Sequence, residues 1–179
     1  MKKVLLLAIS IVFLIYIYNN SYKKEVLIPD EAIRFRVIAN SNTIYDQNIK
    51  IQLKNVIQNK IFELTSNTET IEETRNIIKN NLKDIDVLVK NTLNKLNYDK
   101  NYDIKYGYNY FPKKVYKGVE YKEGDYESLV ITLGDGNGDN WWCVLFPPLC
   151  LVESNENDVS NAEYTFFIKE ILEKYVSAK

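Results

Sequence analysis

The eleven residues Asn140-Trp-Trp-Cys-Val-Leu-Phe-Pro-Pro-Leu-Cys150 hold both tryptophans and both cysteines of the chain, and two of its four prolines. Apolar residues run without interruption from Trp141 to Phe146, which indicates a segment that is buried on all sides or covered by a partner. Pro147 and Pro148 then fix φ and remove two backbone donors, so a regular central strand cannot continue through them. We therefore predict a stiff, turning aromatic segment that the rest of the chain presents or supports.

The residues from 32 to 39 predict a strand with one buried face. Apolar residues 33, 35 and 37 alternate with Arg34 and Arg36, the period of a half-buried strand. The two arginines project from the opposite face, where they are either solvated or paired with Glu127 or a partner. We expect them to be solvated.

Two helices are predicted next. The polar residues 40–43 can turn and cap the chain, and apolar positions from Ile49 to Leu64 then share one helical face. A second helix is expected to begin at Thr70, where Glu73 completes a capping box, and to continue to Leu96. Together they supply the helical layer of the domain.

The remaining elements are strands and a last helix. Residues 102–110 alternate tyrosine or isoleucine with polar residues or glycine, which predicts a half-buried strand whose tyrosines belong to the core more often than to a binding platform. Residues 126–133 predict another strand, and Ser160 can cap a final helix. The order β-α-α-β-β-β-α predicts a single α+β domain over residues 25–179, with an antiparallel sheet packed against helices.

The first 24 residues predict a signal peptide or a signal-anchor. Lys2 and Lys3 precede an apolar run from Val4 to Tyr18 that is broken only by Ser10. A helix of that length reaches about 22 Å, short of a hydrocarbon core of about 30 Å, so a short membrane anchor and a cleaved signal both stay open. We expect residues 25–179 to be exported, with the amino-terminal segment linking the chain to the membrane.

Composition excludes several classes of function. The chain has no histidine, which removes Ser-His-Asp and Cys-His nucleophile activation, and its formal charge of −1 provides no basic surface for nucleic acid. Two cysteines are too few for a four-cysteine zinc site. We predict no catalytic residue, no metal, no cofactor and no nucleic-acid partner.

Cys143 and Cys150 enclose six residues, a loop that fits either a disulfide or two buried thiols. Export makes an oxidising compartment available, so we predict the bond. Loop-closure entropy gives it about 2–3 kcal/mol of stabilisation.

Two polar stretches have ordinary structural explanations. Within Gly134-Asp-Gly-Asn-Gly-Asp139, residues 135, 137 and 139 stand at the first three ligand positions of a calcium loop, but Asn140 and Phe146 stand where that loop needs glycine and glutamate. The stretch leads into no phosphate-binding helix, so we predict a tight turn with positive φ. Asp46, Gln47 and Lys50 lie in the first turns of the first helix, where capping and an i,i+4 ion pair between residues 46 and 50 account for them.

Three blocks of the chain resemble the stage II sporulation protein R family, in the same order. The most diagnostic is 140–150; the others are Val37–Ser41 with Asp46, Gln47 and Lys50, and Tyr126–Leu129 leading into Gly134. Members of this family are made in the forespore, cross its inner membrane and trigger the mother-cell membrane aspartic protease that processes pro-sigma-E. The resemblance implies an exported signal, located between the two membranes, with that protease as its partner.

By this resemblance we place partner recognition in the 140–150 block and at the end of the first strand. If the block is a strand, one indole should enter the core and the other should be exposed or lie under the partner. The predicted partner-binding residues are Trp141, Trp142, Phe146, Pro147, Pro148, Asn40 and Ser41.

Two other functions stay open on the sequence alone. An exported cell-wall-acting enzyme could use Asp46, Glu127 and Asp135 as acid and base. A purely structural membrane-anchored module would use both tryptophans only as core.

Overall fold

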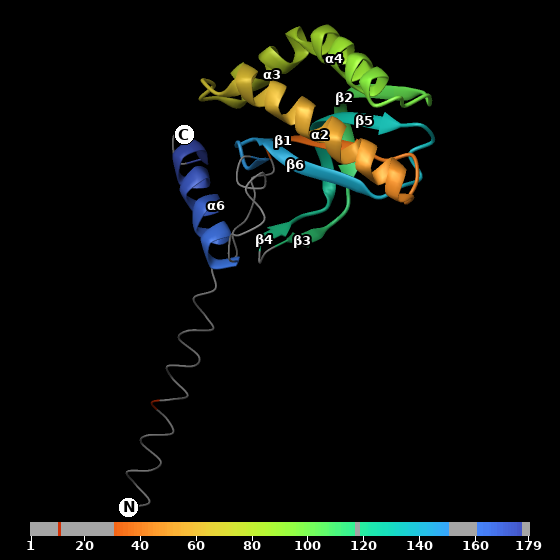
Figure 1. Cartoon of the computed structure of the whole chain (residues 1–179). Helices are drawn as coiled ribbons and strands as arrows, with labels where there is room; N and C mark the ends of the chain where they lie inside the picture. Colours follow the sequence, from red (N-terminus) through yellow and green to blue (C-terminus); the bar gives the residue numbers. More distant parts are fainter. Residues whose placement is uncertain (1–10, 12–30, 117–118, 151–160, 177–179) are drawn as a thin grey trace, which may run out of the picture.

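Three helices cover one face of a four-stranded sheet, and a short hairpin lies beyond the other face (Figure 1). The computed structural model describes residue 11 and residues 31–116, 119–150 and 161–176. Its elements are β1 (Ile33–Ile38), α2 (Ile44–Thr65), α3 (Ile71–Asn80), α4 (Leu82–Lys95), β2 (Tyr102–Phe111), β3 (Lys114–Tyr116), β4 (Val119–Tyr121), β5 (Gly124–Leu133), β6 (Asn140–Phe146) and α6 (Asn161–Val176).

The sheet is mixed, with strand order β2-β5-β1-β6. Strand β1 is antiparallel to β6 but parallel to β5, and β2 is antiparallel to β5. The prediction of an α+β fold is confirmed, and the prediction of an antiparallel sheet is wrong for the β1–β5 pair. The helices α2 to α4 separate β1 from the later strands, so no hairpin forces β1 to run antiparallel to its neighbour.

The second predicted helix is two helices. Its capping box forms as expected, with Thr70 accepting from the Glu73 amide and Glu73 accepting from the Thr70 amide. The helix is interrupted at Asn81, whose side-chain amide donates to the Ile77 carbonyl at 2.8 Å. An asparagine that bonds to the preceding turn competes with the helical backbone, which explains the break.

The sheet has an apolar core on each face. On the helix side, Phe35 and Val37 of β1 pack with Leu53 and Ile57 of α2 and with other buried residues. On the opposite side lies a second cluster formed by Ala32, Phe111, Val119, Tyr121, Tyr126, Trp142, Val144, Leu149 and Ile168. Both faces of β6 are therefore buried, which agrees with its uninterrupted apolar sequence.

The second core buries Arg34 and partly covers Arg36, against the expectation that both are solvated. Arg34 is 0% exposed, and its guanidinium carbon lies 3.3 Å from the ring centre of Tyr126 and about 5 Å from those of Phe111 and Trp142. Burial lowers the pKa of Arg34 to about 10, so it remains charged at neutral pH. Arg36 is partly exposed, with its guanidinium carbon 4.2 Å from the ring centre of Phe111. The alternative of a Glu127 partner is also wrong, because Glu127 pairs with Arg75.

The predicted signal or anchor over residues 1–24 lies outside the described residues, apart from Ile11, and so does the predicted cap Ser160. Within the described part of the chain, no helix combines the length and the apolar character needed to cross a membrane.

Candidate functional site

The two tryptophans of β6 point to opposite faces of the sheet, as expected for adjacent residues of a strand. Trp142 is 5% exposed and stacks edge-on with Phe111 and Tyr121, at ring-centre distances of 5.4 and 5.1 Å. Trp141 is only partly buried beside the helix layer, where its ring centre lies 5.8 Å from that of Phe35. The Lys54 ammonium lies 4.4 Å from the indole of Trp141. Trp142 is therefore the core residue, and Trp141 reaches the surface.

The turn after β6 is closed by a disulfide. Cys143 and Cys150 are bonded, with their Cα atoms 5.3 Å apart. Between them the Phe146–Pro147 peptide is cis, Phe146 and Pro147 are buried, and Pro148 is partly exposed. Of the five residues of this block predicted to bind a partner, Trp141 and Pro148 are therefore the ones that present side-chain surface.

We expect Cys143 and Cys150 to be oxidised in the native protein. Alkylation of freshly isolated protein before reduction, followed by mass spectrometry, should find both sulfurs unmodified, and alkylation after reduction should label both. Their Cα separation lies inside the range that a disulfide requires, so the bond forms without backbone movement. Two labelled thiols before reduction would contradict the prediction.

Asn40 and Ser41 direct their polar groups inward, to the start of α2. The Asn40 amide and the Ser41 hydroxyl donate to the same carboxylate oxygen of Asp46, at 2.8 and 2.5 Å. These hydrogen bonds lower the pKa of Asp46, so the carboxylate stays ionised and is not suited to act as an acid. The predicted ion pair with Lys50 does not form: Lys50 donates to Gln47 and to the Asp139 carbonyl, and Lys100 lies 3.6 Å from Asp46.

The glycine-rich loop before β6 is hydrogen-bonded to the segment that contains Asn40 and Ser41. Gly134 and Gly136 have φ of 55° and 66°, which confirms the predicted turn. The amides of Asn137 and Gly138 donate to the carbonyls of Asn40 and Ala39, at 3.0 and 2.9 Å. A Cβ at position 138 would collide with the Ser41 backbone, so the close approach requires glycine. These bonds give the 40–41 segment a structural role at the end of β1.

The predicted partner-binding residues do not gather in one place. Ile38, the last residue of β1, pairs with Asn140, the first residue of β6, so Asn40 and Ser41 lie beyond the start of β6. Pro147 and Pro148 follow the other end of β6. Seven residues of strand separate the two groups, about 23 Å at the rise of a strand.

Glu127 is neutralised by a residue that sequence analysis did not single out. Arg75 of α3 donates through Nε and Nη2 to the Glu127 carboxylate at 2.7–2.9 Å, and the Tyr106 hydroxyl donates at 2.9 Å. Burial alone would raise the pKa of Glu127, but the bonds from Arg75 and Tyr106 outweigh it and lower the pKa. The sequence feature that could have drawn attention to Arg75 is the rarity of arginine, since Arg75 is one of only three arginines among 23 basic residues. Arginine is the residue best suited to pair with a buried carboxylate.

The carboxylates that the enzyme alternative would use, those of Asp46, Glu127 and Asp135, lie apart from one another. Glu127 pairs with Ile33 at the start of β1, whereas Asp46 lies beside Asn40, past the end of that strand. Asp135 is exposed on the glycine-rich loop, where its amide donates to Asn40. Among the residues that the structure describes, no group of three or more His, Cys, Asp or Glu side chains is arranged to hold a metal ion. The arrangement thus gives this alternative no support.

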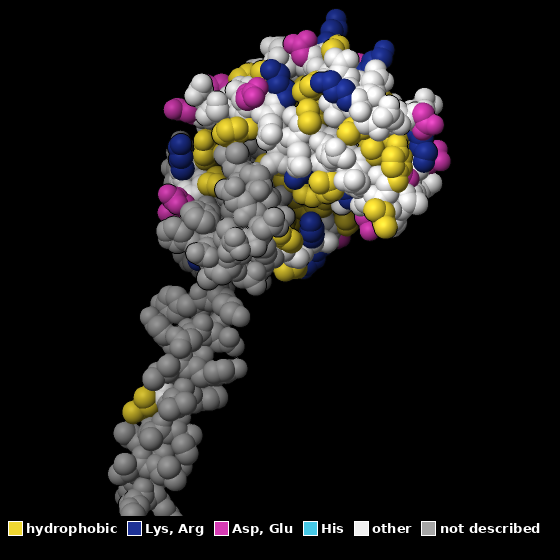
Figure 2. Space-filling model, in the orientation of Figure 1, with side chains coloured by type: hydrophobic (Ala, Val, Ile, Leu, Met, Phe, Trp, Pro, Cys, Tyr) yellow, Lys and Arg dark blue, Asp and Glu magenta, His cyan; other side chains and the backbone are white. Residues whose placement is uncertain are grey.

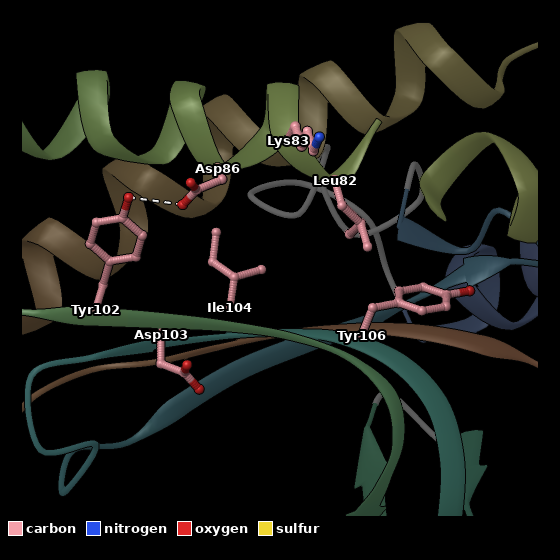
Figure 3. A pocket seen from close by; sticks show the side chains of 7 residues that line it. All are labelled: Leu82, Lys83, Asp86, Tyr102, Asp103, Ile104 and Tyr106. Carbon is pink, nitrogen blue, oxygen red and sulfur yellow. Dashed lines mark hydrogen bonds between the residues drawn. The ribbon is translucent and has the colours of Figure 1, made fainter. Parts of the chain in front are cut away.

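An open groove lies between α4 and β2, with a volume of about 480 Å³. Tyr102, Ile104 and Tyr106 point from the strand toward the helix, and Asp103 points to the other side (Figure 3). The Tyr102 hydroxyl donates to Asp86 at 2.9 Å, and burial followed by this contact raises the pKa of Tyr102 to about 12. The tyrosine is therefore protonated at neutral pH and serves as a donor, not as a base.

A disulfide-closed aromatic turn at the edge of a helix-covered mixed sheet defines this molecule as a disulfide-stabilised α+β domain. The family profile of stage II sporulation protein R matches residues 29–156. The chain is also 37% identical over 161 residues to the stage II sporulation protein R of Bacillus subtilis (strain 168), an alignment that covers 90% of this chain and 68% of that relative. The chain belongs to the stage II sporulation protein R family. No solved structure matches it.

Proposed function

We propose that this protein is an exported sporulation signal that activates a membrane-embedded aspartic protease, which then processes pro-sigma-E. Family membership carries the proposal, because the profile covers most of the described domain. The signal acts after export from the forespore into the space between the two membranes. Its amino-terminal segment either anchors it there or is removed.

Two features of the domain support action as a ligand outside the cytoplasm. A disulfide that closes the turn after β6 persists in an oxidising compartment and is rare in the cytosol. The uncharged segment from Trp141 to Cys150 presents Trp141 and Pro148 on its surface, and aromatic residues dominate the energetic centres of protein interfaces. The exposed aromatic and proline surface favours a binding role, whereas the disulfide fits the exported signal and the exported enzyme equally.

Reconstitution in cells tests the proposal. The full chain is produced together with the protease and pro-sigma-E in a bacterium that is not sporulating, and shortening of pro-sigma-E is followed by immunoblot. We expect shortening only when all three proteins are present. Leu7→Arg provides the export control, because a charge within the apolar run costs about 2.5–3.5 kcal/mol on insertion scales. An exported, folded chain that leaves pro-sigma-E intact would overturn the proposal, and hydrolysis of cell-wall material by it would favour the enzyme.

A further inference from the structure

Strand β2 forms one edge of the sheet, and among the described strands it pairs only with β5. In an antiparallel pair, successive residues direct both of their backbone groups to alternate sides of the strand. The Asn101 carbonyl accepts from the Gly134 amide at 2.7 Å, so the odd-numbered residues face β5. The even-numbered residues from Tyr102 to Tyr110 therefore direct their N–H and C=O groups outward.

The outward backbone groups of β2 are open to another strand. Within the described part of the chain, none of them has a hydrogen bond. The strand is ten residues long, whereas strands usually have about five or six. A long edge of unpaired backbone groups is a template for a strand of another chain. The chemistry of this edge thus asks for a second strand and not for a small molecule.

The accessible part of the edge is centred on Ile104. The groove between α4 and β2 follows the strand from Tyr102 to Tyr106, and its apolar surface includes Ile104 and Leu82. Beyond Tyr106 the strand curves away from the helices (Figure 3). A straight partner strand can therefore pair with the five residues 102–106.

The charges beside Ile104 are self-complementary. Asp103 and Lys105 have side chains that are 55% and 72% exposed. If two copies pair antiparallel with Ile104 on a two-fold axis, Asp103 of each copy faces Lys105 of the other, in the pairs where opposite side chains lie closest. The two neighbouring registers with the same hydrogen-bond pattern would place Asp103 opposite Asp103, or Lys105 opposite Lys105. Charged residues usually protect an edge from pairing, but here they select one register.

Helix α4 adds a second complementary pair. Asp86 lies beside Tyr102, whose hydroxyl it accepts, and Lys83 lies nearer Tyr106 (Figure 3). Because Tyr102 of one copy faces Tyr106 of the other in this register, Asp86 of each copy comes beside Lys83 of the other. Acidic and basic side chains are interspersed over α3 and α4 at the top of the space-filling view, so no single sign of charge keeps two copies apart there (Figure 2).

We propose that β2 is the interface of a symmetric dimer of this chain, in which Tyr102–Tyr106 of the two copies pair antiparallel around a two-fold axis at Ile104. The three even-numbered positions exchange about six main-chain hydrogen bonds. The same patch of both copies forms the contact, as two-fold symmetry requires. Strand β6 lies at the opposite edge of the sheet, so each copy keeps Trp141 and the disulfide-closed turn free. The dimer goes beyond the proposed function and does not depend on it.

Sedimentation equilibrium of the full chain in density-matched detergent tests the dimer. We expect reversible dimerisation in the micromolar range, as for a small interface. Lys105→Asp should weaken it about tenfold, because each dimer then contains two like-charge pairs in place of two opposite ones. Adding Asp103→Lys to the same chain restores opposite charges and should restore the dimer. Lys60→Asp is the matched control, since it reverses an exposed charge on α2, away from the edge.

Cysteine cross-linking tests the register. Copies with Asp103→Cys and copies with Lys105→Cys, carrying different tags, are mixed and oxidised. Cross-links should join the two variants, because directly opposite residues of a strand pair lie within the Cα separation that a disulfide spans. Either variant alone should give few, because residues that are diagonal across the pair lie about 7–8 Å apart.

Several results would overturn the dimer. One is a chain that stays monomeric throughout the micromolar range. Another is a dimer that Lys105→Asp does not weaken or that the double substitution does not restore, since its interface then lies elsewhere. A monomer that binds the protease and loses that binding on Lys105→Asp would show instead that the edge receives a strand of the partner.

Discussion

Trp142→Ala will lower the free energy of unfolding by about 3–5 kcal/mol, the range for truncating a large buried aromatic residue. The indole of Trp142 packs in the second core against Phe111 and Tyr121 and beside the buried guanidinium of Arg34. The substitution therefore leaves a cavity next to a buried positive charge. Urea denaturation measures the loss. Trp142→Phe should recover part of it, because a smaller aromatic ring keeps some of these contacts.

Trp141→Ala should behave differently, although the two residues are adjacent. Its stacking on Phe35 and the contact with Lys54 account for about 1–2 kcal/mol of stability, so the domain should still fold. If Trp141 contacts the partner, activation of the protease will be lost while the folded structure remains. Equal destabilisation by both alanine substitutions would contradict this division, and so would unchanged pro-sigma-E processing in the Trp141 variant.

Local features of the fold could be predicted because their causes are local. The positions of the strands β1 and β2, the capping box at Thr70 and the positive φ of Gly134 each depend on neighbouring residues. The prediction that the tyrosines of β2 belong to the core is wrong for Tyr108 and Tyr110, which are 75% and 56% exposed. The opposite orientation of Trp141 and Trp142 follows from the two-residue period of a strand. The parallel pairing of β1 with β5 could not be read in this way, because about 90 residues separate these strands and sequence periodicity does not identify a strand's partner.

The prediction that Arg34 and Arg36 are solvated failed for a different reason. Arg34 and Arg36 lie on the polar face of a strand that alternates as if half-exposed, yet the β3–β4 hairpin, β6 and α6 contribute to a second core on that face. Aromatic residues take the place of a counter-ion around the guanidinium of Arg34, an arrangement that alternation does not signal. For the same reason the sequence identified the 140–150 block as a candidate site but could not show that Gln58 and Phe62, some 90 residues earlier, share a pocket with it.

Arg75→Leu is the second substitution with a large expected effect, a loss of about 3–5 kcal/mol at neutral pH. Arg75 supplies the cation for Glu127, whose side chain is only 8% exposed, so removing it leaves a buried carboxylate uncompensated. Arg75→Leu combined with Glu127→Leu should recover most of the loss, because replacing both members of a buried pair is often close to neutral. Lys60→Leu is the control, since the Lys60–Glu63 pair is exposed and should contribute at most about 1 kcal/mol.

The pH dependence of the Arg75→Leu variant gives the ion pair a signature that simple loss of packing would lack. In the unsubstituted protein the pKa of Glu127 is lowered on folding, so its ionisation contributes stability that is present above the unfolded-state pKa and lost as pH falls through the folded-state pKa. Without Arg75, burial would dominate and raise that pKa, so the carboxyl would take up a proton on folding and the penalty would shrink in acid. Urea denaturation at about pH 7 and about pH 4, near the ordinary glutamate pKa, should therefore show the two proteins differing less at the lower pH. An equal difference at both pH values, or a double variant as unstable as Arg75→Leu alone, would show that Arg75 stabilises the domain through its packing and not through its charge.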